Sequence, residues 1–189
     1  MLDYWDNEWV KRLSGSASPS MNVEKMAKLI YELTMTPEMA EMEKLEIGCG
    51  PCVHARHLAN VYDGWRTKYT GIDLSPTAIK WAQDAGLNAI CGDAFTHKFD
   101  KKFDCFIFLD CLEHIFNHEA LSEVVKDNAN GTPFIFGNIP LYCQAHAQEV
   151  ERMLSIKDIV KFCSAIGNTH FDYEIYGSYG LPYARFTAS

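Results

Sequence analysis

Segment 45–50, Leu-Glu-Ile-Gly-Cys-Gly, sets the class of fold. A short apolar strand pattern ends here in two glycines, which allow a ligand to approach the backbone closely. From this segment onward, strand-like and helix-like stretches alternate along the chain. Such alternation implies right-handed crossovers and a parallel sheet with helices packed on it.

Periodicity predicts the individual elements. We expect strands at 45–47, 69–73, 87–91, 103–109 and 132–136, and helices at 53–61, 76–85, 116–125 and from 155 to 166. The helix at 76–85 is well marked, because Ser75 can cap it, Pro76 suits its first position and Gly86 can end it. The nearly unbroken apolar run 103–109 is typical of a central strand covered on both faces.

The two ends of the chain differ from this alternating core. Residues 171–175 and 181–183 alternate apolar and polar side chains around a Gly-Ser-Tyr-Gly turn, which predicts a C-terminal hairpin. The apolar residues of 23–33 recur at helical spacing and follow a loop rich in glycine and serine. We therefore predict an N-terminal helical cap at 1–36 and a core at 43–186.

These elements define the predicted architecture. We expect a single domain over 1–189, built on a seven-stranded Rossmann-like sheet. Its core strands are parallel, its last strand is antiparallel, and helices cover both faces.

Composition excludes several classes of protein. The chain has 189 residues, 48% of them hydrophobic, and a formal net charge of -8, which argues against a broad basic face for nucleic acid. Its N-terminus lacks the pattern of a signal peptide, and no apolar run approaches a membrane span, so a cytoplasmic protein is expected. Seven cysteines are an odd number, and most lie in apolar runs, which predicts reduced, buried thiols.

Polar residues follow the first three strands. Asp73 ends the second strand, 23 residues after Gly50, where a carboxylate can accept hydrogen bonds from both hydroxyls of a ribose. Asp93 follows the third strand directly. A nicotinamide-dinucleotide fingerprint would need glycine at position 53, which is Val53, so nicotinamide cofactors are disfavoured.

Four segments in this order resemble the class I S-adenosylmethionine-dependent methyltransferases. They are L-E-I-G-C-G at 45–50, G-I-D-L-S at 71–75, C-G-D-A-F at 91–95 and F-D-C-F-I-F-L-D-C-L-E-H-I at 103–115. The resemblance spans roughly 43–186 and implies S-adenosylmethionine as the cofactor. One departure is Cys52, where many members have a third glycine.

The resemblance also implies roles for individual residues. The glycine loop would border the methionine part of the cofactor, Asp73 would hold the ribose, and Asp93 with Ala94 would face the adenine. The cofactor residues implied in this way are Glu46, Gly48, Cys49, Gly50, Asp73, Leu74, Asp93, Ala94 and Asp110.

A second constellation, Asp110-x-x-Glu113-His114, follows the fourth strand. It is similar to the E-x-x-E-H element that helps bind a divalent metal in ubiquinone-biosynthesis O-methyltransferases and small-RNA 2′-O-methyltransferases. The resemblance allows Mg²⁺ or Mn²⁺ here, with His146 as a fourth ligand. It also allows a metal-free role, in which Glu113 and His114 shape the pocket or His114 supplies a base, or simple helix capping.

The function predicted from these motifs is methyl transfer to a hydroxyl group, with a small molecule as the expected acceptor. A non-catalytic subunit that binds the cofactor is the alternative. Cys49-Gly50-Pro51-Cys52 also matches thioredoxin-like redox sites, but that activity gives no reason for Asp73 or Asp93. Segment 109–112, after the fourth strand, lacks the motif of adenine-methylating DNA enzymes, and segment 138–142 follows the fifth strand instead, so nucleobase methylation is disfavoured. Tyr4, Trp5 and Arg12 resemble an N-terminal lid over the cofactor.

Overall fold

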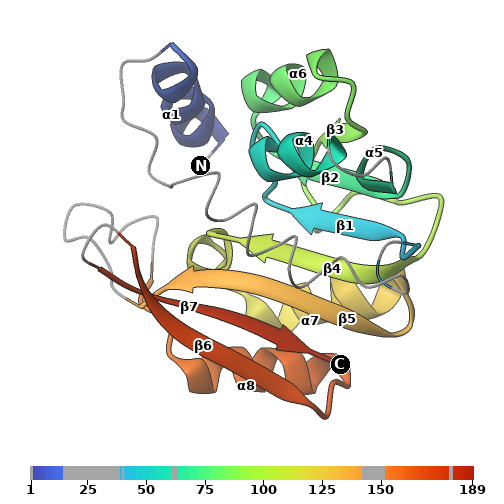
Figure 1. The fold of residues 1–189 in the computed structure, drawn as a ribbon, viewed down its shortest axis with the longest axis vertical. Helices are drawn as coiled ribbons and strands as arrows, with labels where there is room; N and C mark the ends of the chain where they lie inside the picture. Colours follow the sequence, from blue (N-terminus) through green and yellow to red (C-terminus); the bar gives the residue numbers. More distant parts are fainter. Residues whose placement is uncertain (1, 15–38, 40, 61–63, 142–151, 179–180) are drawn as a thin grey trace. The chain divides into compact units, whose positions relative to one another are not determined.

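The computed structural model describes residues 2–14, 39, 41–60, 64–141, 152–178 and 181–189. The chain divides into two compact units, residues 1–96 and 97–189. Each unit is built on strands with helices packed against them (Figure 1). The helix predicted at 23–33 lies outside the described residues.

Unit 1 contains three parallel strands, β1 (Lys44–Ile47), β2 (Tyr69–Asp73) and β3 (Ala89–Cys91). In their register Ile47 lies opposite Ile72, and Asp73 lies opposite Cys91. The three strands therefore end at the same edge, and the loops that follow them lie next to one another.

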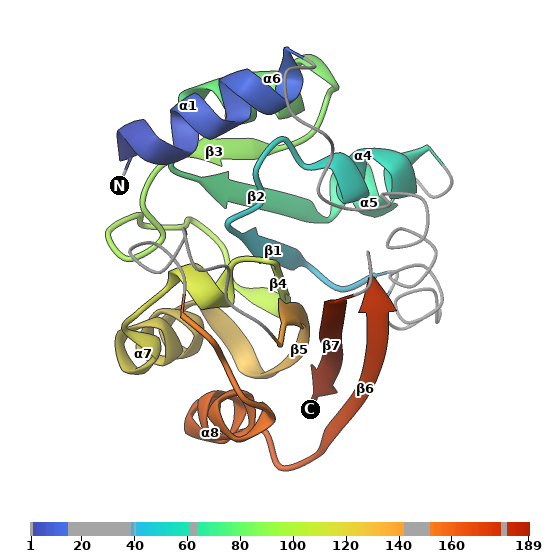
Figure 2. The same cartoon turned by 90° about the vertical axis from the view of Figure 1, so that its left-hand side faces the viewer.

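Four helices complete the described part of unit 1: α1 (Leu2–Leu13), α4 (Val53–Ala59), α5 (Gly64–Thr67) and α6 (Pro76–Asp84). Helix α6 begins as predicted, because the Ser75 side chain accepts a hydrogen bond from the backbone N–H of Ala78. Helix α1 packs alongside α6 (Figure 2).

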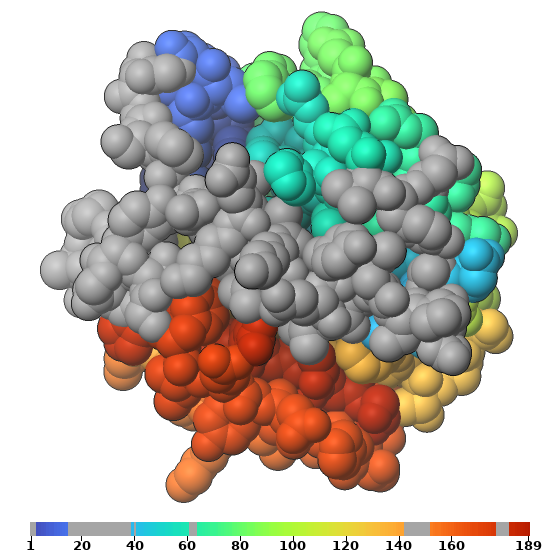
Figure 3. All heavy atoms as spheres, in the orientation of Figure 1, coloured from blue at the N-terminus to red at the C-terminus, as the bar shows by residue number. Residues whose placement is uncertain are grey.

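Unit 2 contains β4 (Phe103–Leu109), β5 (Ala129–Pro140), β6 (Phe171–Ser178) and β7 (Leu181–Ala188). Strand β5 is parallel to β4, and β7 pairs antiparallel with both β5 and β6. A short 3₁₀ turn, η1 (Leu112–His114), follows β4, and helices α7 (His118–Asn128) and α8 (Ile156–Ile166) pack together. Strand β6 lies at one edge of the sheet. Its atoms belong to the orange to red part of the surface that Figure 3 shows.

The strand order is β3-β2-β1-β4-β5-β7-β6 in a seven-stranded sheet, so the predicted fold class is confirmed. The core strands are parallel and the last strand of the chain is antiparallel. Fully buried core side chains include Leu45, Ile72, Leu58, Phe103, Phe106, Phe108, Phe136 and Phe186. No helix of the described residues is long and apolar enough to cross a membrane.

Several predicted boundaries need correction. The helix expected at 116–125 begins at His118, because the Asn117 side chain accepts a hydrogen bond from the backbone N–H of Ala120 and so caps the helix there. The fifth strand is longer than expected, because its pairing with β4 and β7 extends it to Ala129–Pro140. The third strand is shorter than expected and covers Ala89–Cys91.

Candidate functional site

The loop after β1 is held against β2 by its backbone. Gly48 and Gly50 have φ values of 70° and 51°, a left-handed conformation that glycine adopts without strain. The N–H groups of Gly48 and Cys49 donate to the Ile72 carbonyl at 2.9 and 3.2 Å. The glycines therefore serve both the tight turn and the close approach of the loop to β2.

Asp73 joins this loop to the start of α6. Its Oδ2 accepts the N–H of Gly50 at 2.8 Å, and its Oδ1 accepts the N–H of Ser75 at 2.9 Å. Burial raises the pKa of the Asp73 carboxyl, and the backbone hydrogen bonds from Ser75, Gly50 and Leu74 oppose that shift. Each carboxylate oxygen keeps a further lone pair, so Asp73 can still accept ribose hydroxyls.

The segment after β3 lies against the same edge. Gly92 donates its N–H to the Asp73 carbonyl at 2.9 Å, and the Cys91 thiol lies 3.6 Å from the Leu74 carbonyl. Asp93 forms an Asx turn, because its Oδ1 accepts the N–H of Phe95 at 2.9 Å. The implied cofactor residues after β1, β2 and β3 are thus brought together in unit 1.

A buried cluster lies beneath the glycine loop. Glu46 is only 3% exposed, and the Tyr69 hydroxyl donates to its Oε2 at 2.5 Å. A Cβ atom at Gly71 would lie 2.7 Å from the Cys49 sulfur and 2.9 Å from the Cys52 sulfur. Burial raises the pKa of Glu46 to about 8, against the lowering effect of the Tyr69 hydrogen bond. The structure thus directs the Glu46 carboxyl toward Tyr69, and its contact with a cofactor stays a prediction.

The two thiols of this cluster do not form a redox site of the thioredoxin kind. Cys49 and Cys52 are both free and buried. Burial, with the neighbouring Cys52, raises the pKa of the Cys49 thiol well above its usual value. A reactive dithiol needs the opposite, an accessible sulfur with a lowered pKa. The two side chains instead fill the space above Gly71.

Helix α1 contacts both the glycine loop and the start of α6. Asp6 Oδ1 accepts hydrogen bonds from the Ser75 hydroxyl at 2.6 Å and the Thr77 N–H at 3.0 Å. The Ser75 hydrogen bond and then the Thr77 N–H lower the pKa of Asp6. A Cβ atom at Gly50 would lie 2.5 Å from the Trp9 ring, so the indole lies directly over this glycine.

Unit 2 holds the Asp110-x-x-Glu113-His114 constellation, and Asp110 is its first residue. Its φ of 48° is unusual for a residue with a side chain. Asn138 donates from Nδ2 to Asp110 Oδ1 at 2.5 Å, and the Tyr176 hydroxyl donates to Asn138 Oδ1 at 2.5 Å. Burial, with the charge of Asp110, raises the pKa of the Tyr176 hydroxyl.

Glu113 and His114 lie on η1. Glu113 is 3% exposed, and its Oε1 lies 3.8 Å from His114 Nε2, which is too long for a hydrogen bond. Within the described ranges, no three His, Cys, Asp or Glu side chains lie together as a metal ion would require. The predicted Mg²⁺ or Mn²⁺ site is therefore not supported, and its fourth ligand, His146, lies outside the described residues.

Four residues of these sites, Asp6, Trp9, Asn138 and Tyr176, could not be found from sequence patterns. Asp6 and Ser75 are 69 residues apart, and Asp110 and Asn138 are 28 residues apart, so only the folded chain joins them. Trp9 and Tyr176 likewise reach their partners through tertiary packing.

The fold and the sheet edge of unit 1 can be compared with known families. Residues 45–130 match the family described as Methyltransferase domain. This stretch of the chain therefore matches a methyltransferase domain, the class of protein that the sequence motifs predicted.

Particular relatives agree with this class. The chain is 27% identical to norajmaline N-methyltransferase of Rauvolfia serpentina over 142 residues, which are 70% of this chain and 48% of the relative. It is 29% identical to ajmaline N-methyltransferase of the same plant over 109 residues, 52% of this chain and 36% of that relative. The chain thus spans half or less of the length of these relatives.

A solved structure shows the same fold over nearly the whole chain. It is magnesium protoporphyrin IX methyltransferase from Synechocystis PCC 6803 with bound S-adenosylhomocysteine. The TM-score is 0.73 at 14% identity, and the match covers 98% of this chain and 95% of that one. At this identity the likeness defines the fold alone.

The raised pKa of Glu46 predicts a pH dependence of stability. Between about pH 4.5 and 8 the folded state keeps a proton that the unfolded state releases, so this group lowers stability as the pH rises. Glu46→Gln removes the titration. We expect the stability of the variant minus that of wild type, both measured as free energies of unfolding, to increase by on the order of a few kcal/mol from pH 5 to pH 8.

Urea unfolding at several pH values checks this expectation. The matched control is Glu123→Gln, which changes an exposed glutamate of α7 that pairs with Lys126. Its stability curve should run parallel to that of wild type. A Glu46→Gln curve that also runs parallel to wild type would show that the buried carboxyl is ionised.

The contacts of Asp6 predict that this carboxylate holds α1 in place. Asp6→Ala removes the acceptor of both hydrogen bonds from the start of α6, and we expect trypsin to cleave after Lys11 and Arg12 roughly two- to fivefold faster. Asp3→Ala changes an exposed acid on the same helix and should leave the cleavage rate unchanged. Equal rates in the two variants would show that α1 is held by its other contacts alone.

Proposed function

We propose that this chain transfers the methyl group of S-adenosylmethionine to a nitrogen atom of a small molecule. Cofactor binding is supported above all by the position of Asp73, because its carboxylate accepts hydrogen bonds from both the glycine loop and the start of α6. The names of the two plant relatives favour nitrogen as the acceptor atom. A hydroxyl, which the sequence predicted, is the second candidate.

The residues after β1, β2 and β3 fit this cofactor. Any side chain at position 50 would collide with the Trp9 ring, and Gly50 avoids this collision. Asp73 has lone pairs that can accept hydrogen bonds from ribose hydroxyls. Asp93 and Ala94 would border the adenine, and Leu74 and Cys49 would line the same edge. When bound, the cofactor supplies an electrophilic methyl group on a sulfonium, and the chain's own task is alignment and the exclusion of water.

The acceptor half consists of Asp110, Glu113 and His114. His114 is 16% exposed at its side chain, and we assign it the role of the base that takes a proton from the acceptor. Glu113 lies beside it and would stabilise the protonated imidazole. Asp110, fixed by Asn138, would provide the negative charge that attracts a cationic amine. The net charge of -8 would attract such an amine.

Helix α1 is part of this proposal as a lid over the cofactor. The sequence suggested Tyr4, Trp5 and Arg12 for this role. In the structure Trp9 lies over Gly50, and the Arg12 guanidinium lies 5.2 Å from the centre of the Trp9 ring. Trp9 would therefore cover the methionine part of the cofactor, with Arg12 supporting the ring from outside.

Cofactor binding is tested by calorimetry with S-adenosylhomocysteine. Asp73→Ala should weaken binding by roughly 5- to 150-fold, because the hydrogen bonds to the ribose and to the Gly50 N–H are lost. The control Asp84→Asn changes an exposed acid of α6 that pairs with Lys80, and should bind like wild type. Binding of a nicotinamide dinucleotide in place of S-adenosylhomocysteine would overturn the proposal.

Methyl transfer itself is tested with methyl-labelled S-adenosylmethionine and matched pairs of secondary amines and phenols. We expect label in the amines, and His114→Ala should lower kcat by roughly 10²-fold. The control His170→Ala removes an exposed imidazole that pairs with Asp172. Label in phenols alone would establish the hydroxyl candidate. Cofactor binding without any transfer would favour a non-catalytic subunit.

A further inference from the structure

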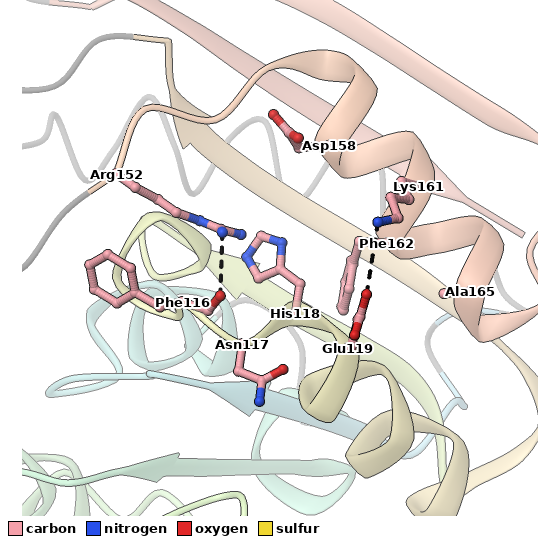
Figure 4. A pocket seen from close by; sticks show the side chains of 9 residues that line it. All are labelled: Phe116, Asn117, His118, Glu119, Arg152, Asp158, Lys161, Phe162 and Ala165. Carbon is pink, nitrogen blue, oxygen red and sulfur yellow. Dashed lines mark hydrogen bonds and ion pairs between the residues drawn. The ribbon is translucent and has the colours of Figure 1, made fainter.

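Unit 2 contains a cavity of about 390 Å³ that the proposed methyl transfer does not use. It lies between α7, α8 and the segment that precedes each helix (Figure 4). Its lining includes Phe116, His118, Arg152, Phe162 and Ala165. All of these residues belong to unit 2, whereas Gly50 and Asp73 belong to unit 1.

Arg152 provides a cationic group with unused donors at this cavity. Its Nη1 donates to the Phe116 carbonyl at 3.3 Å. Its Nε–H is buried and has no hydrogen-bond partner among the described residues. A guanidinium has five N–H donors, and a buried donor without a partner is costly. An anion with two oxygens would satisfy this group in the geometry that arginine prefers.

The other charges of the lining have partners, and Asp158 also lies near Arg152: hydrogen bonds from Ser155, and then the charges of Arg152 and His118, lower the pKa of the Asp158 carboxyl. Asp158 Oδ2 accepts the Ser155 N–H at 2.8 Å and the Ser155 hydroxyl at 2.7 Å, as the cap of α8. Lys161 Nζ lies 3.9 Å from Glu119 Oε1, so these two charges face each other. In the part of the chain that is described, Arg152 has no ion pair within 4.0 Å, which leaves it as the cation for a ligand.

His118 supplies a hydrogen-bond acceptor. Its Nε2 lies 3.0 Å from the Leu112 carbonyl, which can only accept, so the proton of the neutral ring is on Nε2. Burial, together with the charge of Arg152, lowers the pKa of the imidazole. The neutral ring therefore has Nδ1 as an acceptor for an O–H or N–H donor.

The remaining walls are apolar. Phe162 is 2% exposed, and its ring centre lies 5.5 Å from that of His118. Phe116, at 49% exposed, forms the opposite wall with its ring at the surface. A flat aromatic body would gain contacts with both rings.

We infer that this cavity binds a small aromatic carboxylate that carries a hydrogen-bond donor on its ring. The carboxylate would pair with Arg152, the ring would lie between Phe116 and Phe162, and the donor would bind His118 Nδ1. The backbone N–H of Arg152 donates to the Glu113 carbonyl at 2.9 Å, so the segment that carries Arg152 is fixed to the loop of Glu113. This inference is independent of the methyl acceptor.

The test is a titration of the ¹⁵N-labelled full chain with 4-hydroxybenzoate, followed by amide chemical shifts in the absence of any cofactor. We expect shifts confined to 112–120, 152 and 158–165, with a dissociation constant of roughly 0.1–1 mM, the range for a ligand of this size. 4-Hydroxybenzamide lacks the charge and benzoate lacks the donor, so each should bind at least about threefold more weakly.

Two variants and a control complete the experiment. Arg152→Gln should weaken 4-hydroxybenzoate at least about tenfold, whereas Lys157→Gln, which removes a charge from the exposed face of α8, should not. Ala165→Trp keeps Arg152 but fills the cavity, and should abolish binding. The inference is wrong if the shifts map to other residues, if nothing binds at 10 mM, or if Arg152→Gln folds and binds like wild type.

Discussion

The hydrogen bonds of the Asp73 carboxylate organise unit 1. One oxygen holds the Gly50 N–H and the other holds the Ser75 N–H, so a single side chain fixes the loop after β1 and the start of α6. Asp6 of α1 then binds the Ser75 hydroxyl, and Gly92 binds the Asp73 carbonyl. Four segments that are distant in the sequence therefore meet at one residue, at the edge where a parallel sheet binds its ligand.

The buried cluster beneath the glycine loop explains why the chain has residues here that cofactor binding alone would not require. Glu46 and Tyr69 form a buried pair, and Cys49 and Cys52 fill the space above Gly71. The raised pKa values of Glu46, Cys49 and Tyr69 favour neutral groups, which are less costly to bury than charges. The Cys-Gly-Pro-Cys motif is therefore explained by packing beneath a tight loop rather than by redox chemistry.

Much of the fold could be read from local patterns, because strands such as 69–73 and caps such as Ser75 depend on neighbouring residues. The meeting of the residues after β1, β2 and β3 at one edge could also be predicted, since parallel strands end together, whereas their contact with the cofactor stays a proposal. The contacts of Asp6 with Ser75 and of Asp110 with Asn138 could not, because they join segments whose spacing follows no rule. The predicted metal site is not supported among the described residues, because the spacing of residues along η1 does not determine the direction in which their carboxylates point.

A crystal structure of the chain with S-adenosylhomocysteine tests the central claim most directly. The account predicts that both ribose hydroxyls lie within hydrogen-bond distance of Asp73, with the adenine beside Asp93 and Ala94 and the indole of Trp9 over the amino-acid part. It also predicts that Asp73 keeps its hydrogen bond from the Gly50 N–H. Electron density for the ligand away from this edge, or an Asp73 carboxylate with no contact to the ribose, would contradict it.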